Sequence, residues 1–160
     1  MKRSSTLFLK TVLILVALGT LALMIRLPQT EGRAKNLDLI SIYSDPFIIY
    51  IYIASIPFFT AFYQAFKLLG YVDRDTIFSQ VSVNAVRNIQ YCAVAIVGFI
   101  LGAEAFLFIV MRGTGDDITG GITMGIIITS ISIVIATAAA VFQKLLQNAV
   151  AIKAENDLTV

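Results

Sequence analysis

Residues 118–143 read ITGGITMGIIITSISIVIATAAAVFQ, and this stretch decides the fold class. It contains no charged residue and no proline, and it is longer than the roughly 20 apolar residues with which a helix crosses a bilayer. Backbone N–H and C=O groups in lipid must find partners within the chain, which a helix provides. The stretch therefore predicts an all-α integral membrane protein.

Three further apolar segments of spanning length precede this stretch, at about residues 7–27, 46–69 and 88–111. The second follows Asp45 and begins at Pro46, a capping carboxylate before the residue favoured in a first helical turn, and Gly70 is of the type that ends helices. The first resembles a signal peptide, but no small-residue cleavage site follows it, so we expect a retained span. Together the segments predict one membrane domain over residues 1–160, built as a four-helix bundle.

Composition excludes several function classes. The chain is 58% hydrophobic, with a mean hydropathy of +0.87, and soluble domains are about 45–50% apolar. Its net charge of +2 is too small and too scattered for direct binding of nucleic acid. The chain has no His and one Cys, Cys92, and it shows no nucleophile–base pair and no metal-ligand cluster. We therefore expect no cofactor, no metal and no enzymatic activity.

Basic residues near the span ends predict the orientation, because cytoplasmic loops are rich in Lys and Arg. One side of the membrane holds both termini and the connection between the second and third spans. It carries eight of the twelve basic residues, namely Lys2, Arg3, Lys10, Lys67, Arg74, Arg87, Lys144 and Lys153. We expect both termini in the cytoplasm of a bacterial cell, with the protein in the cell membrane.

Small residues recur at three- and four-residue steps in the last two spans. Helices in lipid pack closely through such residues. The third span carries Ala95, Gly98, Gly102 and Ala105, and the fourth carries Gly121, Gly125, Thr129, Ser132, Ala136 and Ala140. These stripes predict helix–helix seams inside the monomer, and a dimer interface or a pore lining is the alternative.

Two amphipathic segments lie on the cytoplasmic side, at about residues 76–88 and 144–156. The first places Phe78, Val81, Ala85 and Ile89 on one helical line. The second continues the fourth span, whose helix would then reach about 60 Å against a hydrocarbon core of about 30 Å. These segments can pack on each other, on lipid headgroups or on a partner. On the outer side, residues 27–44 could form a short strand or lie on the headgroups.

Glu104 is the one acidic residue inside a predicted span. Ionisable groups inside a membrane are costly and point to function by default. It could pair with Arg26 or Arg112 near the outer interface, or it could take part in handling a proton, an ion or a ligand. It lies about 200° around the helix from Gly102, so the two residues should face different neighbours.

Several segments resemble a bacterial family of small four-span membrane proteins catalogued as domain of unknown function 2975. The resemblance rests on residues 56–59 (IPFF), 63–69 (YQAFKLL), 142–146 (FQKLL) and 155–160 (ENDLTV), together with Phe78-Ser79, Ala85 and Asn88-Ile89. It implies a neighbouring gene for a small cytoplasmic helix-turn-helix regulator. It carries over no catalytic or ligand-binding residue.

Two hypotheses follow. The first is a regulatory or sensor component that binds the helix-turn-helix regulator, with the terminal residues Asp157, Leu158, Thr159 and Val160 as the candidate contact. The second is a small transporter, channel or immunity-type membrane protein that uses Glu104. A four-helix monomer leaves little room for an aqueous path, so the second hypothesis requires a homo-oligomer.

Overall fold

The computed structural model describes residues 3–30, 38–110 and 119–157. These residues form α1 (Arg3–Thr30), α2 (Leu39–Tyr43), α3 (Pro46–Asp73), α4 (Gln80–Val110) and α5 (Thr119–Asp157). Within these ranges, four helices are long and apolar enough to cross a membrane, at Ser4–Gln29, Pro46–Asp73, Gln80–Ile109 and Thr119–Asn156. The prediction of an all-α, four-span membrane protein is confirmed.

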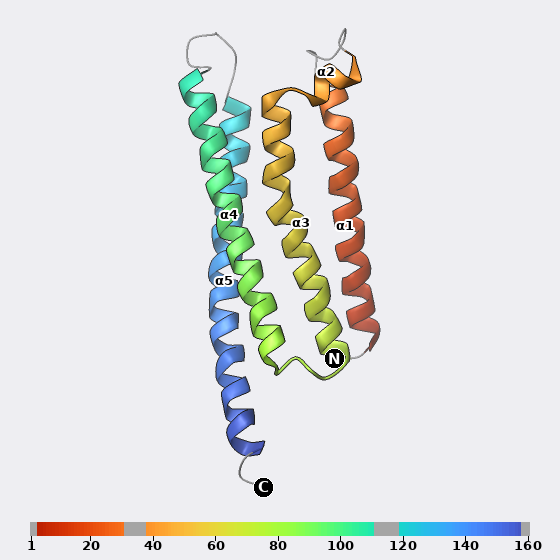
Figure 1. Ribbon diagram of the computed structural model, residues 1–160, viewed down its shortest axis with the longest axis vertical. Coiled ribbons are helices and arrows are strands. Elements are labelled where there is room, and N and C mark those ends of the chain that lie inside the picture. Colours follow the sequence, from red (N-terminus) through yellow and green to blue (C-terminus); the bar gives the residue numbers. More distant parts are fainter. Residues whose placement is uncertain (1–2, 31–37, 111–118, 158–160) are drawn as a thin grey trace.

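The four long helices run side by side along one axis (Figure 1). The start of α1, the end of α5 and the connection from α3 to α4 lie at the same end, and α2 lies at the other. The most extensive interface joins α4 to α5, followed by α3 with α4 and α1 with α3. In the described ranges α1 and α5 share no comparable interface, so the bundle is open between them.

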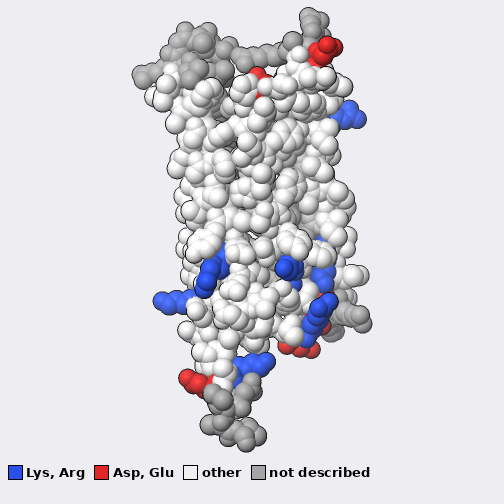
Figure 2. Space-filling view, in the orientation of Figure 1, with Lys and Arg blue, Asp and Glu red and all other residues white. Residues whose placement is uncertain are grey.

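The surface of the long helices is apolar. Leu15, Ile56, Ile109 and Val134 are each at least 60% exposed, as suits side chains that contact lipid rather than water. Figure 2 shows the middle of this face free of charged side chains, with Lys and Arg gathered in a band toward the end that holds the end of α5. This distribution is that of a bundle crossing a bilayer, with its charges at the headgroups.

The start of α3 follows the predicted capping pattern. The Asp45 carboxylate accepts hydrogen bonds from the backbone N–H groups of Phe47 at 2.8 Å and Ile48 at 3.4 Å, and Pro46 occupies the first turn. The expected stop at Gly70 is wrong, because α3 continues to Asp73. The left-handed residue that turns the chain is instead Asp75, with φ of 54°, a conformation that Asp tolerates better than most residues.

The predicted apolar line of the segment 76–88 is wrong at Phe78 and Val81 but right at Ala85, which is buried, and at Ile89, which packs against the core at this end of the bundle. The helix begins only at Gln80, so Phe78 lies in the preceding turn and is 51% exposed, and Val81 is 55% exposed. Besides Ala85, the buried side chains on this turn of α4 are Ser82, Val83 and Val86, which the predicted line did not include. The burial direction is decided by α5, because Val83 and Val86 form one core cluster with Ala139 and Leu146 of that helix.

This cluster shows that the two amphipathic segments pack on each other. Leu68 of α3, Ile77 of the connection, Ile89 and Val150 are packed against the same core. Part of the second segment remains uncovered, since Leu145 is 61% and Ile152 66% exposed.

The strand alternative for residues 27–44 is wrong over the part that the structure describes. Residues 39–43 form the short helix α2, whose Ile42 N–H donates to Asp38 O at 3.1 Å and whose Ile42 side chain is 7% exposed. A helical turn satisfies its backbone locally, which a strand without a neighbouring strand cannot do. Residues 31–37 lie outside the described ranges.

An ion pair joins α1 to α3 near the end where the chain starts. Lys10 donates to the Asp73 carboxylate and its ammonium lies 5.7 Å from the centre of the Phe66 ring. Lys10 therefore reaches a carboxylate at the end of the neighbouring helix, which lowers the cost of a cation near the bilayer.

Candidate functional site

The seam between α4 and α5 is built on the small-residue stripe of α5. Gly125, Ser132, Ala139 and Leu146 are buried and recur at intervals of seven residues, the repeat that keeps one helical face against a partner helix. Thr129, Ala136 and Ala140 are half-buried along the same face. Gly121 is exposed, although a Cβ there would lie 3.4 Å from Leu107 Cδ1 of α4.

Glu104 of α4 projects onto Gly125 of α5. A Cβ added to Gly125 would lie 2.8 Å from Glu104 Cδ and 3.0 Å from Cγ, and its nearest neighbour would be Oε1. These separations are below the roughly 3.5–4.0 Å at which carbon atoms pack. The absent side chain of Gly125 is therefore the space that the Glu104 carboxyl occupies.

Two polar atoms of this seam are buried without a hydrogen-bond partner among the described residues, namely Glu104 Oε1 and Thr129 Oγ1. No ion pair to Glu104 is present in the described ranges, so Arg26 does not pair with it, and Arg112 lies outside those ranges. Thr129 follows Gly125 by one helical turn on the same face.

Three other hydroxyl groups of α5 have hydrogen-bond partners. Thr123, Ser130 and Thr137 each donate to the carbonyl four residues earlier at 2.8 Å. Beyond this seam, Thr6 Oγ1 of α1 is also buried without a hydrogen-bond partner among the described residues. A carboxyl and a hydroxyl that lack partners in an apolar setting can accept a proton, a water molecule or a small cation.

The stripe of the third span does not form one seam. Gly102 faces α3, where a Cβ would lie 2.7 Å from Tyr50 Oη. Gly98 would meet nothing within 4 Å, Ala105 is exposed and Ala95 is half-buried. The prediction of a packing stripe is corrected to one close contact, because α4 meets α3 and α5 on different faces and the stripe lies largely between them. Glu104 faces α5 while Gly102 faces α3, so the two do meet different neighbours.

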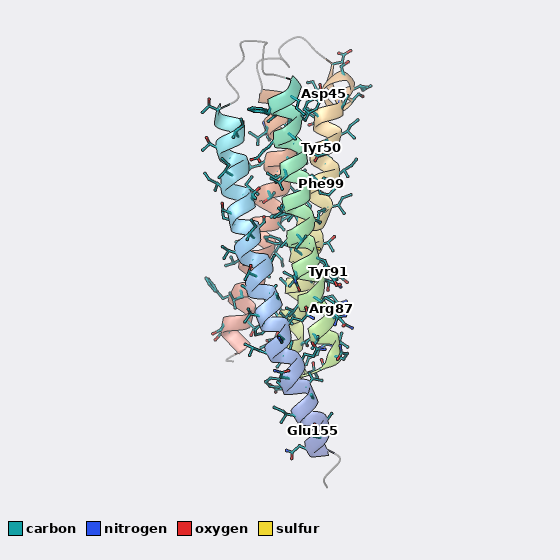
Figure 3. The ribbon with its side chains drawn as sticks, turned by 90° about the vertical axis from the view of Figure 1, so that its left-hand side faces the viewer. Asp45, Tyr50, Arg87, Tyr91, Phe99 and Glu155 are labelled. Carbon is teal, nitrogen blue, oxygen red and sulfur yellow. The ribbon has the colours of Figure 1, made fainter. Side chains whose placement is uncertain are left out.

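The contact at Gly102 belongs to a hydrogen bond between helices. Tyr50 Oη of α3 donates to Phe99 O of α4 at 2.6 Å, and Figure 3 shows the two residues at neighbouring heights in the bundle. A pocket of about 330 Å³ adjoins this contact, lined by Pro46, Phe47, Tyr50, Gly102, Ala103 and Phe106. Its lining is aromatic and apolar apart from the Tyr50 hydroxyl, so it offers shape rather than charge to a ligand.

Two further tyrosines join α1 to its neighbours. Pro28 has no N–H, so Met24 O lacks its usual helical donor. Tyr52 Oη of α3 donates to Met24 O at 3.0 Å, and Tyr43 Oη of α2 donates to Ile25 O at 2.8 Å. Counting four residues back from Pro28 would have identified the free carbonyl, but not its donor.

The terminal candidate residues lie at the limit of the described chain. Asp157 is the last residue of α5, and Leu158, Thr159 and Val160 lie outside the described ranges. Glu155, near the tip of α5, lies beyond the other helices (Figure 3). Across the described residues no three His, Cys, Asp or Glu side chains group as a metal site would require.

Comparison with known proteins supplies the family. The chain is 44% identical over 162 residues to the Bacillus subtilis (strain 168) protein named "Uncharacterized membrane protein YoaS", and the alignment covers all of both chains. No solved structure matches the fold. Residues 28–160 match the family described as protein of unknown function DUF2975, which includes α2 to α5 and leaves most of α1 outside. At this identity and coverage, the chain belongs to the DUF2975 family of membrane proteins.

Proposed function

We propose that this protein is a regulatory membrane component that binds a cytoplasmic helix-turn-helix regulator through the end of α5. The observation that carries the proposal is the uncovered apolar surface of that end. Ile152 is 66% exposed on a part of α5 that extends past the other helices (Figure 1). Lys153 and Glu155 are also exposed, so the segment offers the mixed apolar and charged surface of a protein-binding helix.

The orientation with both termini in the cytoplasm is part of this proposal. It is supported by the excess of Lys and Arg at the end of the bundle where α1 starts and α5 ends. A cytoplasmic regulator could then reach the end of α5, and a signal at the membrane could change how much regulator is held there.

The test is co-purification of the full chain with the regulator encoded beside it, from detergent-solubilised membranes, together with transcription from the regulator's promoter. Ile152→Gln and a chain lacking residues 155–160 should each release the regulator. Ala151→Gln is the matched control, because Ala151 is an exposed neighbour on the same turn. If every variant retains the regulator and leaves transcription unchanged, or if wild type never captures it, the proposal fails.

A second candidate function is proton or cation transfer by an oligomer through Glu104. The buried, unpartnered Glu104 Oε1 on the α4–α5 seam favours it. Flux into proteoliposomes should then be lost in Glu104→Gln and kept in Glu155→Gln, which removes an exposed carboxylate at the tip of α5. Equal flux in both variants, or a strictly monomeric protein with no flux, would rule this candidate out.

A further inference from the structure

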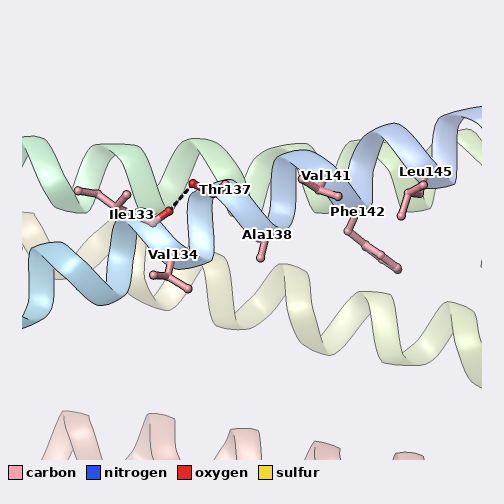
Figure 4. A pocket seen from close by; sticks show the side chains of 7 residues that line it. All are labelled: Ile133, Val134, Thr137, Ala138, Val141, Phe142 and Leu145. Atoms are coloured by element: carbon pink, nitrogen blue, oxygen red, sulfur yellow. Dashed lines mark hydrogen bonds between the residues drawn. The ribbon is translucent and has the colours of Figure 1, made fainter.

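A shallow, open apolar groove lined by α5 alone lies on the side of α5 that faces away from α4. It has a volume of about 700 Å³ and is lined by Ile133, Val134, Thr137, Ala138, Val141, Phe142 and Leu145 (Figure 4). The one hydroxyl in it is already satisfied, because Thr137 Oγ1 donates to Ile133 O at 2.8 Å. The groove therefore presents hydrocarbon only to whatever occupies it.

The shape of the groove suits a flexible chain better than a helix. Ala138 in its middle is small, but Ile133 and Val134 about one turn before it and Phe142 and Leu145 one to two turns after it are bulky. Close helix packing in membranes needs small residues over several turns. The small residues of α5 lie on the opposite seam, where Gly125, Ser132 and Ala139 are buried against α4.

The cationic side chain of Lys144 lies near one end of the groove. Lys144 follows Thr137 by seven residues, about two turns, so it lies on the same side of α5 as the lining. Lys144 is exposed, and it forms no ion pair with any residue that the structure describes. Lys144 also belongs to the end of the bundle where Figure 2 shows the band of basic side chains.

We propose that this groove is a binding site for an anionic phospholipid, whose acyl chain lies against Ala138 and whose phosphate is bound by Lys144. Among the described helices α5 has an extensive interface only with α4, so its opposite side, with the groove, is open to lipid. The charge of Lys144 makes the site selective for phosphatidylglycerol over phosphatidylcholine.

The chain contains no Trp, so a single introduced Trp gives an unambiguous fluorescence reporter. Phe142→Trp places it in the groove, where Phe142 is 44% exposed. Tyr91→Trp is the matched control on α4, 63% exposed and one turn from Arg87, so it has a nearby cation but lies outside the groove of α5 (Figure 3). Both variants are reconstituted into phosphatidylcholine vesicles that contain brominated phosphatidylglycerol or brominated phosphatidylcholine as the quencher.

The expected result is that brominated phosphatidylglycerol quenches the Phe142→Trp reporter with an affinity about fivefold above that of brominated phosphatidylcholine, the factor that one Lys near an anionic surface contributes. The preference at the Tyr91→Trp control should be clearly smaller. Lys144→Gln should remove the preference in the groove. Lys153→Gln, an equal charge change on the opposite side of α5 and about 13 Å farther along, should retain it.

Three outcomes would overturn the proposal. Equal quenching of the groove reporter by the two lipids means that no headgroup is selected. Equal effects of Lys144→Gln and Lys153→Gln mean that only the general surface charge matters. A groove reporter that neither lipid quenches, beside a control that both quench, means that protein covers the groove. Circular dichroism of each variant verifies that the helices are intact.

Discussion

Gly125→Ala tests whether the Glu104 carboxyl occupies the space that the glycine leaves. The new Cβ would lie 2.8 Å from Glu104 Cδ and 3.0 Å from Cγ. Rotation of the carboxyl alone cannot relieve this contact, because Cγ is also too close, so the whole side chain must move by about 0.5–1 Å to reach normal packing distances. Such overpacking costs about 1–3 kcal/mol, against which Ala gains about 0.8–1 kcal/mol of helix propensity over Gly.

The overpacking energy is isolated by a double-mutant cycle with Glu104→Ala. In that background the obstructing side chain is gone, so Gly125→Ala should stabilise the protein by its helix propensity alone. The coupling energy between the two sites should therefore be about 1–3 kcal/mol. Gly98→Ala is the matched control, since a Cβ there would meet nothing within 4 Å and its effect should be the same in both backgrounds.

The assay is thermal and denaturant unfolding in detergent, followed by the reaction of Cys92 with a thiol-reactive fluorophore. Cys92 is the single cysteine of the chain and is half-buried on α4, so unfolding raises its accessibility. Helical circular dichroism verifies the transition independently. A coupling energy near zero, with Gly125→Ala equally destabilising in both backgrounds, would refute the placement of Glu104 against α5.

Three further predictions use the same assay. Gly102→Ala should lower the free energy of unfolding by about 1–3 kcal/mol, because the new Cβ would lie 2.7 Å from Tyr50 Oη. In a Tyr50→Phe background, which lacks this hydroxyl, most of the effect should be absent. An equal loss with Tyr50 and with Phe at position 50 would contradict this contact. Tyr52→Phe should lower the free energy of unfolding by about 0.5–2 kcal/mol in the wild type, because Met24 O loses its donor. In a Pro28→Ala background the helix supplies its own N–H to Met24 O, so the same substitution should have little effect. An equal loss in both backgrounds would contradict the assignment of Tyr52 as the replacement donor. Lys10→Gln should lower the free energy of unfolding by about 0–1 kcal/mol, because it removes a partly exposed ion pair. High salt screens that pair, so the difference between wild type and variant should disappear there. A difference that does not depend on salt would indicate a packing role for Lys10 instead.

Elements that depend on local chemistry were predictable. The four spans follow from the length of each apolar run, because a bilayer sets one minimum length for every helix that crosses it. The start of α3 follows from Asp45 and Pro46, whose cap involves only adjacent backbone groups. The stripe on α5 was recognised from its spacing, and Gly125 and Ser132 of that stripe are buried in the structure.

Errors arose where a neighbouring helix decides the outcome. Phe78 and Val81 fit an apolar helical line, but α5 contacts the face that carries Val83 and Val86. An amphipathic pattern with several small and apolar residues permits more than one buried face, and the partner selects among them. Gly70 has the chemistry of a helix stop, but the turn is made three to five residues later, where Asp75 adopts the left-handed conformation.

In the candidate site, too, local features were predictable and contacts between helices were not. The sequence alone identified Glu104 as the acidic residue inside a span and indicated that it faces away from Gly102. It did not identify Gly125 as the residue that receives the carboxyl, nor Tyr50 and Tyr52 as donors to α4 and α1. Each of these contacts joins residues that are distant in sequence, and their pairing depends on how far one helix is shifted along another.

The number of spans and their helical form follow from the sequence alone, and comparison with known proteins places the chain in the DUF2975 family. Hydropathy and length suffice for this because lipid accepts so few backbone conformations. The tertiary structure is needed to show which faces meet, that Glu104 Oε1 lies against Gly125 without a partner among the described residues, and that a groove is open on the side of α5 away from α4. Lipid solvates every apolar face almost equally, so hydropathy cannot rank the possible pairings, and the fit between particular side chains must do so.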